Sequence, residues 1–273
     1  MVLSFPPFTR AVKWLLGVNT GVYLLIVLLG SAGQRGLIHW IEDFLALSPK
    51  DVIHGYVWQL ATYSFIHYEF WHWFGNMLGI WLFGAQLEQL WRTRRFLELY
   101  FFSVIGAALV TVFLSYTTIL GPPTATTIGA SGGVFGILMA FGVLFAESEI
   151  MLIPFPFQIK AKYFVGMLIL LELIFAIQER NGGISYLAHL GGLLFGYLYV
   201  KFVPRTGLLT GASERYYGVR NSYYKFKRRR AARKFEVYMR QHGREVGPYF
   251  DEYGNYRGPQ KDEKDDRKGP WVN

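Results

Sequence analysis

The sequence predicts an all-α membrane protein, a bundle of six transmembrane helices followed by a basic tail. Three observations support this fold class. Charged residues make up only 17% of the 273-residue chain and hydrophobic residues 52%, whereas soluble domains carry about a quarter charged residues. Residues 100–146 contain no Asp, Glu, Lys or Arg. Residues 201–273 hold 18 Lys and Arg against 9 Asp and Glu, so the net charge of +9 belongs to the tail.

Six apolar stretches approach the roughly 20 residues that cross a bilayer. Hydropathy places them at 11–31, 72–91, 96–119, 129–147, 162–178 and 184–203. Gly121-Pro122-Pro123 divides the long uncharged region into a hairpin of two helices. The first stretch follows Arg10 and Lys13 and has features of a signal peptide, but because further spans follow we expect a retained first helix. We expect residues 1–203 to form the membrane core and 204–273 a partly helical, then disordered, cytoplasmic tail.

The basic residues of the short linkers indicate the orientation. If the six helices cross the membrane in alternating directions, the basic tail lies on the same side as Arg10, Lys13, Arg92, Arg94, Arg95, Lys160 and Lys162. The linkers on the other side contain only Arg35, Lys50 and Arg180. The positive-inside rule then places both termini in the cytoplasm. Residues 32–71 become a long external loop, in which "LIHWIEDFLAL" has the apolar spacing of a helix lying in the membrane interface.

Polar residues recur at one depth of this bundle. The second, fourth and sixth helices run inward from the outer face, so their first turns lie at a similar level. These turns carry His72 and Asn76, then Ser131, then His189. The spacing of His72 and Asn76 puts both on one helix face. Because polar groups within spans tend to face the bundle interior, we expect the four side chains to meet near the outer face.

This set of residues predicts acyl-transfer chemistry. An imidazole can take the proton of a serine hydroxyl, which is a weak nucleophile without a base. Backbone N–H groups at a helix N-terminus and the Asn76 amide, with His72 beside it, can stabilise the oxyanion. Structural alternatives remain open for all four residues. Ser131 could be a small packing residue, and His189 a hydrogen-bonded core histidine. Asn76 could make an interhelical hydrogen bond, and His72 could simply lie at the membrane interface.

The segment Gly129–Gly133 also matches the G-x-S-x-G motif of soluble hydrolases. In those enzymes the serine follows a strand of a soluble sheet. Here Ser131 follows a proline-broken membrane hairpin, which excludes that interpretation. The chain has no cysteine, so disulfides, thiol catalysis and Cys-ligated metals are excluded as well.

Over residues 56–203 the chain resembles the rhomboid intramembrane serine proteases. The resemblance rests on three motifs in order: His72-x-x-x-Asn76, the Gly-x-Ser-Gly of Gly129–Gly132, and Ala188-His189-x-x-Gly192-x-x-x-Gly196. It implies that Ser131 is the nucleophile in a loop that includes Gly129 and Gly132. It further implies that His189 is the general base and acid, that Asn76 and His72 form the oxyanion hole, and that no metal or cofactor takes part.

The resemblance also suggests packing roles and two departures. Gly192 and Gly196 would let the sixth helix pack tightly on the fourth, as small residues do in membranes. Phe135 stands where a tyrosine often stacks on the catalytic histidine, so the ring contact is expected to remain without the hydroxyl. Trp58-Gln59 replaces a Trp-Arg pair, so an ion pair that anchors the external loop is expected to be missing.

Other polar residues have less defined roles. Glu172 lies inside the fifth helix near the depth of His189, where a carboxylate could orient the imidazole as in a triad. The family uses a dyad, so a structural carboxyl is the favoured interpretation. Glu88 and Arg92 are predicted to pair as i,i+4 anchors. The remaining histidines are expected at interfaces or in solvent, without metal-ligand spacing: His39, His54, His67 and His242.

The composition of the tail predicts a binding partner that differs from the substrate of the membrane core. Residues 220–234 contain eight Lys and Arg, no acid and several aromatics. Next to a membrane span this composition predicts binding to anionic lipid headgroups. Nucleic acid is a minor alternative that membrane tethering disfavours, and no nucleic-acid partner is expected.

The sequence therefore predicts a multi-pass serine endopeptidase of a bacterial inner membrane that cuts the transmembrane helices of other proteins. Such a substrate must unwind locally, because its carbonyls are otherwise bonded within the helix. A loop near 179–184 is expected to cover the water-filled site. The alternative is a non-catalytic rhomboid-like scaffold that binds transmembrane helices. A transporter is disfavoured because no internal repeat is evident.

Overall fold

The structure is a computed structural model that describes residues 5–117, 125–151, 158–178, 184–204 and 207–243. It divides into two compact units, Met1–Gly207 and Leu208–Asn273, which are described separately. The proline break near residue 122, the loop 179–183 and the last part of the tail lie outside the described residues.

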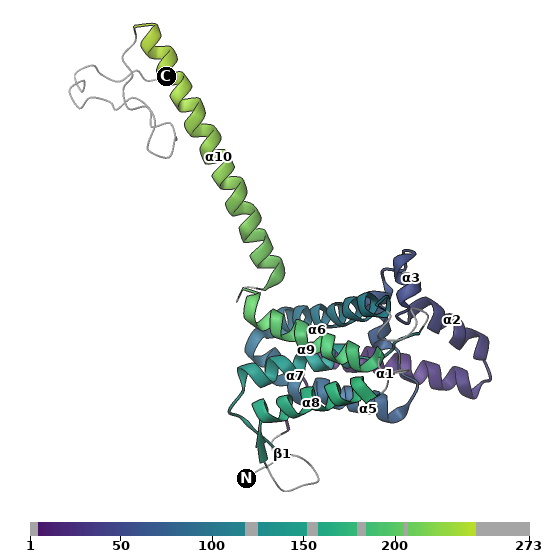
Figure 1. Cartoon of the computed structure of the whole chain (residues 1–273). Coiled ribbons are helices and arrows are strands. Elements are labelled where there is room, and N and C mark those ends of the chain that lie inside the picture. Colours follow the sequence, from purple (N-terminus) through teal and green to yellow (C-terminus); the bar gives the residue numbers. More distant parts are fainter. Residues whose placement is uncertain (1–4, 118–124, 152–157, 179–183, 205–206, 244–273) are drawn as a thin grey trace, which may run out of the picture. The chain divides into compact units, whose positions relative to one another are not determined.

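The described chain is mostly helical, as the sequence predicts (Figure 1). The helices of the first unit are α1 Arg10–Ser31, α2 Arg35–Leu45, α3 Pro49–Ile53, α4 Gln59–Thr62, the 3₁₀ turn η1 Tyr63–Phe65, α5 Phe70–Gly79, the π-helical turn η2 Ile80–Gly84, α6 Ala85–Ser115, α7 Ser131–Leu144, α8 Ala161–Gln178 and α9 Ile184–Phe202. The second unit contains α10, Leu208–Gln241.

Each of the six predicted apolar stretches coincides with a helix of this set. The second and third are joined, because α5, η2 and α6 follow one another without a gap. Arg92 has φ 64° and ψ 164° and breaks the helical geometry where the linker is predicted. By length and composition, two stretches of the described chain could cross a membrane, Arg10–Ser31 and Phe70–Ser115. The count of six spans remains a prediction.

The centre of the bundle is built on glycines. A β-carbon at Gly192 of α9 would lie 2.2 Å from the carbonyl oxygen of Gly132 of α7, and one at Gly196 would lie 2.6 Å from that of Gly136. Since real β-carbons do not approach backbone atoms so closely, only glycine allows α7 and α9 to touch backbone to backbone. α6 packs against both of these helices, so α7 lies among α6, α8 and α9 (Figure 1).

The predicted pair between Glu88 and Arg92 is wrong. The buried Glu88 carboxylate instead accepts hydrogen bonds from the backbone N–H groups of Ala11 at 2.9 Å and Val12 at 3.1 Å. It thereby occupies the N-terminus of α1, where an anion is favourable. The i,i+4 geometry is lost because the backbone leaves the helix at Arg92.

The linker between α7 and α8 contains a short antiparallel hairpin that the sequence did not predict. Strand β1 (Glu149–Met151) pairs with β2 (Gln158–Lys160), with Ile150 opposite Ile159. Lys160 lies 2.7 Å from the Glu147 carboxylate, and Lys162 pairs with the same group. The hairpin and its ion pairs connect the end of α7 to the start of α8.

The loop of residues 32–71, which the sequence predicts to be external, is held by hydrogen bonds. Its helix α2 has no buried residue in the structure, which fits an amphipathic element on the surface. Gln59 is buried, and its side chain accepts from the Ser48 backbone at 3.1 Å and donates to the Asp43 carbonyl at 3.0 Å. The neutral amide of Gln59 therefore anchors the loop at the position where the resemblance led us to expect a missing ion pair.

Candidate active site

The N-terminus of α7 brings the predicted nucleophile next to α5. Ser131 is the first residue of α7 and is half-buried. Gly129 precedes it with φ 106°, a conformation that favours glycine. A β-carbon at Gly129 would lie 2.5 Å from Nε2 of His72 and 3.8 Å from Nδ2 of Asn76. The loop before Ser131 therefore touches the His72 ring, and only a residue without a side chain fits there.

His189 of α9 lies against the first turns of α7. Its ring stacks on Phe135, one helical turn after Ser131, with the ring centroids 4.3 Å apart and the planes at 15°. The backbone contact of Gly192 with Gly132 holds α9 at this distance. The structure thus brings together the elements that carry Ser131, His72, Asn76 and His189.

Glu172 makes the closest polar contact of the His189 ring. Its Oε2 lies 2.9 Å from Nδ1 of His189, and Glu172 is only 9% exposed. The neighbouring apolar residues of α8 are exposed, so the carboxylate is directed inward while they face outward. The depth match that the sequence suggests is a direct contact in the structure. A hydrogen-bonded structural carboxyl and a carboxylate that orients the imidazole both fit this contact.

His67 was expected at an interface or in solvent, and that prediction is wrong. The residue is fully buried, and its Nε2 accepts a hydrogen bond of 3.2 Å from the backbone N–H of Ala130. Burial, and then the neighbouring His72, lower the pKa of His67 from 6.5 to about 3. A backbone N–H can only donate, so His67 is neutral with Nε2 unprotonated. It fixes the residue immediately before Ser131.

Asn76 is buried and already has hydrogen-bond partners. Its Nδ2 donates to the His72 carbonyl at 2.9 Å and lies 3.2 Å from Nε2 of His67. To donate to a developing oxyanion, the amide would exchange one of these contacts. The first turn of α7 has no side-chain cap among the described residues, so its backbone N–H groups offer further donors.

The remaining histidines behave as expected from the sequence, since His39, His54 and His242 are exposed. In the part of the chain that the structure describes, no group of three or more His, Asp or Glu side chains is arranged to hold a metal ion.

Comparison with known proteins gives a consistent picture. A model of the Rhomboid domain matches residues 54–206. Rhomboid protein 1, mitochondrial, of Saccharomyces cerevisiae is 31% identical over 211 residues, which are 73% of this chain and 57% of that protein. The putative rhomboid protease YdcA of Bacillus subtilis is 32% identical over 200 residues, 71% of this chain and 90% of that protein. Rhomboid-like protease 3 of Toxoplasma gondii is 28% identical over 146 residues, 54% of this chain and 51% of that protein. The chain thus spans little more than half the length of the yeast and Toxoplasma relatives.

Proposed function

Because the chain belongs to the rhomboid family, we propose that it is an intramembrane serine endopeptidase whose catalytic dyad is Ser131 and His189. Membership makes it an integral membrane protein, and relatives that are named proteases support a protease activity. The observation that carries the proposal is the placement of the His189 ring on Phe135, one turn from Ser131, with Nδ1 already bonded and Nε2 left for the serine.

The proposed reaction proceeds by acyl transfer. Ser131 Oγ attacks the scissile carbonyl while His189 Nε2 takes the hydroxyl proton. The oxyanion is stabilised by the Asn76 amide, His72 and the backbone N–H groups at the start of α7. His189 then gives its proton to the leaving amine, and water attacks the acyl-enzyme with His189 again acting as the base.

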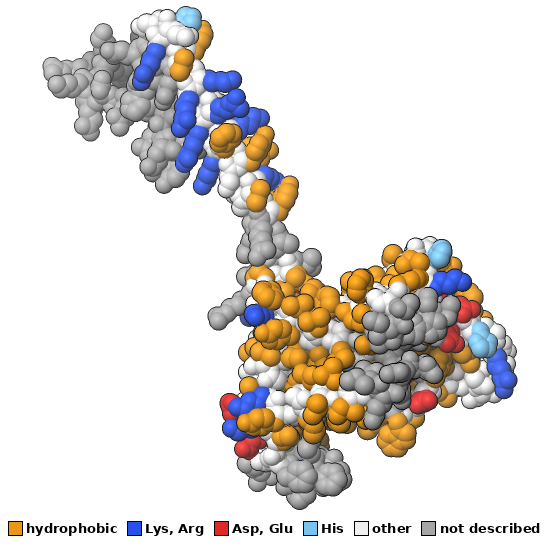
Figure 2. Space-filling view, viewed as in Figure 1, with side chains coloured by type: hydrophobic (Ala, Val, Ile, Leu, Met, Phe, Trp, Pro, Cys, Tyr) orange, Lys and Arg blue, Asp and Glu red, His pale blue; other side chains and the backbone are white. Residues whose placement is uncertain are grey.

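The proposed substrates are transmembrane segments of other proteins. Much of the bundle surface in Figure 2 carries hydrophobic side chains, as expected of helices in contact with lipid. A segment presented from the membrane must unwind near the cleaved bond before its carbonyl can reach Ser131, since helical carbonyls are hydrogen-bonded. Helix-weakening and small residues near the cleavage site are therefore expected.

The alternative, a non-catalytic scaffold, is disfavoured by the intact Ser131 and His189 and is separated from the enzyme by fluorophosphonate labelling. The folded protein should be labelled, and Ser131→Ala should abolish the label. Ser103→Ala is the control, because it removes the hydroxyl of a fully buried serine on α6. Labelling that persists in Ser131→Ala would assign the nucleophile elsewhere, and an unlabelled folded wild type would favour the scaffold.

We also propose that both termini face the cytoplasm of a bacterial cell, with six spans between them. The absence of cysteine makes single-cysteine variants clean reporters. Asp51→Cys in the external loop should react with a membrane-impermeant maleimide on intact cells. Glu147→Cys should react only after permeabilisation. The reverse pattern would invert the topology.

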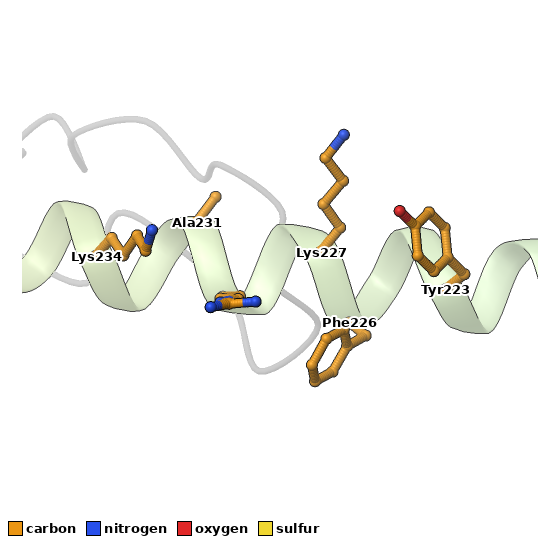
Figure 3. Close-up of a pocket in the computed structure, with 6 residues that line it drawn as sticks. Tyr223, Phe226, Lys227, Ala231 and Lys234 are labelled. Carbon is orange, nitrogen blue, oxygen red and sulfur yellow. The ribbon is translucent and has the colours of Figure 1, made fainter.

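Helix α10 supports the proposal that the tail binds anionic lipid. Most of its described side chains are exposed, and Figure 2 shows basic and hydrophobic side chains interleaved along it. A groove of about 460 Å³ is lined by Tyr223, Phe226, Lys227, Arg230, Ala231 and Lys234. The spacing of these residues places them on one face of the helix, and Figure 3 shows Lys227 and Phe226 pointing toward the two edges of that face. Each basic residue near an anionic surface contributes about 1 kcal/mol.

Hydrogen exchange of the whole protein in nanodiscs tests this proposal. Residues 220–234 should exchange more slowly in phosphatidylserine-containing discs than in phosphatidylcholine discs. The combined variant Lys227→Gln, Arg230→Gln and Lys234→Gln should reduce the difference. Equal exchange in both discs would contradict lipid binding.

A further inference from the structure

Glu172 places a carboxyl group inside the helix bundle, where burial is unfavourable without a partner. Glu172 is 9% exposed on a helix whose neighbouring side chains, Leu171 and Leu173, are exposed at 39% and 44%. Burial of a carboxyl group is unfavourable unless it is hydrogen-bonded, and ionisable residues within membrane helices are rare and mostly functional. The Glu172 carboxyl group contacts the imidazole of His189, with Oε2 2.9 Å from Nδ1.

We propose that Glu172 is a positioning residue that makes the site a Ser131–His189–Glu172 triad. The inference rests on the proposed peptidase function and adds a third group to its two-residue site. The Glu172 carboxylate does not touch the substrate. It acts by fixing which nitrogen of His189 carries the proton and how the ring is turned.

The chemistry follows from what each atom can do. An ionised carboxylate only accepts hydrogen bonds, so the Nδ1 atom that faces Glu172 carries the proton. In neutral His189 the Nε2 atom is then the free base. Stacking on Phe135 holds the plane of the ring, and the contact with Glu172 fixes its rotation within that plane.

The proton balance is closed within the three residues and the substrate. As Ser131 Oγ forms its bond to the carbonyl carbon, the Oγ–H bond breaks and the proton passes to Nε2. The Nδ1–H bond to Glu172 remains, and the negative carboxylate stabilises the imidazolium. The Nε2 proton then leaves with the amine. Two further titratable side chains face this imidazole in the described chain: His72 from α5, and Tyr186 from α9 with its ring centroid 6.2 Å from that of His189.

Three substitutions separate orientation from packing. Glu172→Gln keeps the shape but removes the charge, and its amide can present either an N–H or a carbonyl oxygen to Nδ1, so it no longer fixes the proton on that nitrogen. Glu172→Leu removes the hydrogen bond and leaves the tautomer unbiased. Glu172→Asp keeps the charge on a shorter side chain. If the carboxyl were only a structural hydrogen-bonding group, Glu172→Gln would be the mildest of the three.

We expect kcat of Glu172→Gln to fall by about 10²–10⁴, with KM changed by less than a factor of about 3. Glu172→Leu should also lose rate, and Glu172→Asp should recover part of it. Thermal unfolding in detergent identifies any variant that does not fold. A kcat of folded Glu172→Gln within about twofold of wild type, with Ser131→Ala inactive, would overturn the triad and leave the peptidase intact.

A spectroscopic readout does not depend on activity. In ¹⁵N-histidine-labelled Ser131→Ala protein, the His189 signal, assigned by its loss in His189→Gln, should show a protonated Nδ1 and a free Nε2. Adding Glu172→Gln should lower the share of rings that carry the proton on Nδ1. An unchanged tautomer contradicts the inference whatever the enzyme does, whereas a wild type that neither cleaves nor labels contradicts the proposed function.

Discussion

Helix α9 meets two of its neighbours, α7 and α8, in different ways. Against α7 it packs backbone to backbone, through Gly192 on Gly132 and Gly196 on Gly136. Against α8 it makes a polar side-chain contact, between His189 and Glu172. The first kind of contact fixes how far apart the helices lie, and the second fixes how one ring is turned.

The two interfaces also differ in whether they have room for a larger side chain at a glycine position. A β-carbon at Gly166 of α8 would meet no described atom within 4 Å, while one at Gly192 or Gly196 of α9 would collide with the backbone of α7. Close packing of this kind resists change, because a displacement must move the whole helix. We therefore expect substitutions at α7–α9 to act on both stability and activity, and those at α8 to act mainly through Glu172.

The largest expected effect comes from Gly192→Ala. The added carbon would lie 2.2 Å from a backbone oxygen, so the helices must separate by about 1 Å to reach ordinary contact. Overpacking costs about 1–3 kcal/mol of stability. A misplacement of this size lowers turnover by at least ~10², toward the background of Ser131→Ala. Detergent unfolding and peptide cleavage measure the two effects.

Gly166→Ala is the matched control for that prediction. It adds the same methyl group to α8, where no described atom obstructs it. We expect its stability and turnover to stay near wild type. Equal losses of stability and turnover in the two variants would contradict the proposed difference between the α7–α9 and α8–α9 interfaces.

Asn76→Ala should have the second largest effect and act on turnover more than on stability. If its amide serves the oxyanion, kcat falls by about 10²–10³ while KM stays similar. Asn19→Ala is a close control, because Asn19 is also buried and also donates to the carbonyl four residues earlier, at 2.8 Å. A near-normal kcat in Asn76→Ala would remove this residue from the proposed site.

Phe135→Ala tests how much of the imidazole position comes from α7 rather than from α8. A stacked aromatic pair contributes about 0.5–1.5 kcal/mol beyond its buried area. If that free energy is lost from the productive orientation, kcat should fall by about 2- to 12-fold. Phe135→Tyr keeps the ring and should stay near wild type. A loss as large as that of Glu172→Gln would mean that stacking, not the carboxylate, orients His189.

The sequence predicted α1 and the helices from α5 to α9 well because they form long apolar runs, and even the break at Arg92 coincides with a basic linker. It did not predict the β1–β2 hairpin, whose strands of three residues are too short to show a period. The Glu88–Arg92 pair failed because helical spacing was assumed across a residue with positive φ.

The sequence predicted the depth of the site residues within the membrane spans, but not which face of each helix turns toward the site. Hydropathy gives the level of a residue within a span, so Ser131, His189 and Glu172 could be placed near one another. Which face of α8 turns inward depends on packing, and the contact of Glu172 with His189 follows only from the structure. His67 was missed because a histidine in an aromatic loop is usually interfacial, although its position shortly before His72 and Asn76 was a usable signal.

The smallest expected effect belongs to the outer face of α8. Leu170 is 58% exposed, so Leu170→Ala should change the free energy of unfolding in detergent by less than about 0.5 kcal/mol. Ile137 of α7 is fully buried, and Ile137→Ala should cost about 2–5 kcal/mol. The two truncations remove similar apolar volume from the two neighbours of α9. A large loss from Leu170→Ala would mean that this face of α8 packs against a further surface, such as a second copy of the chain, and cross-linking of a Leu170→Cys variant would then test that contact directly.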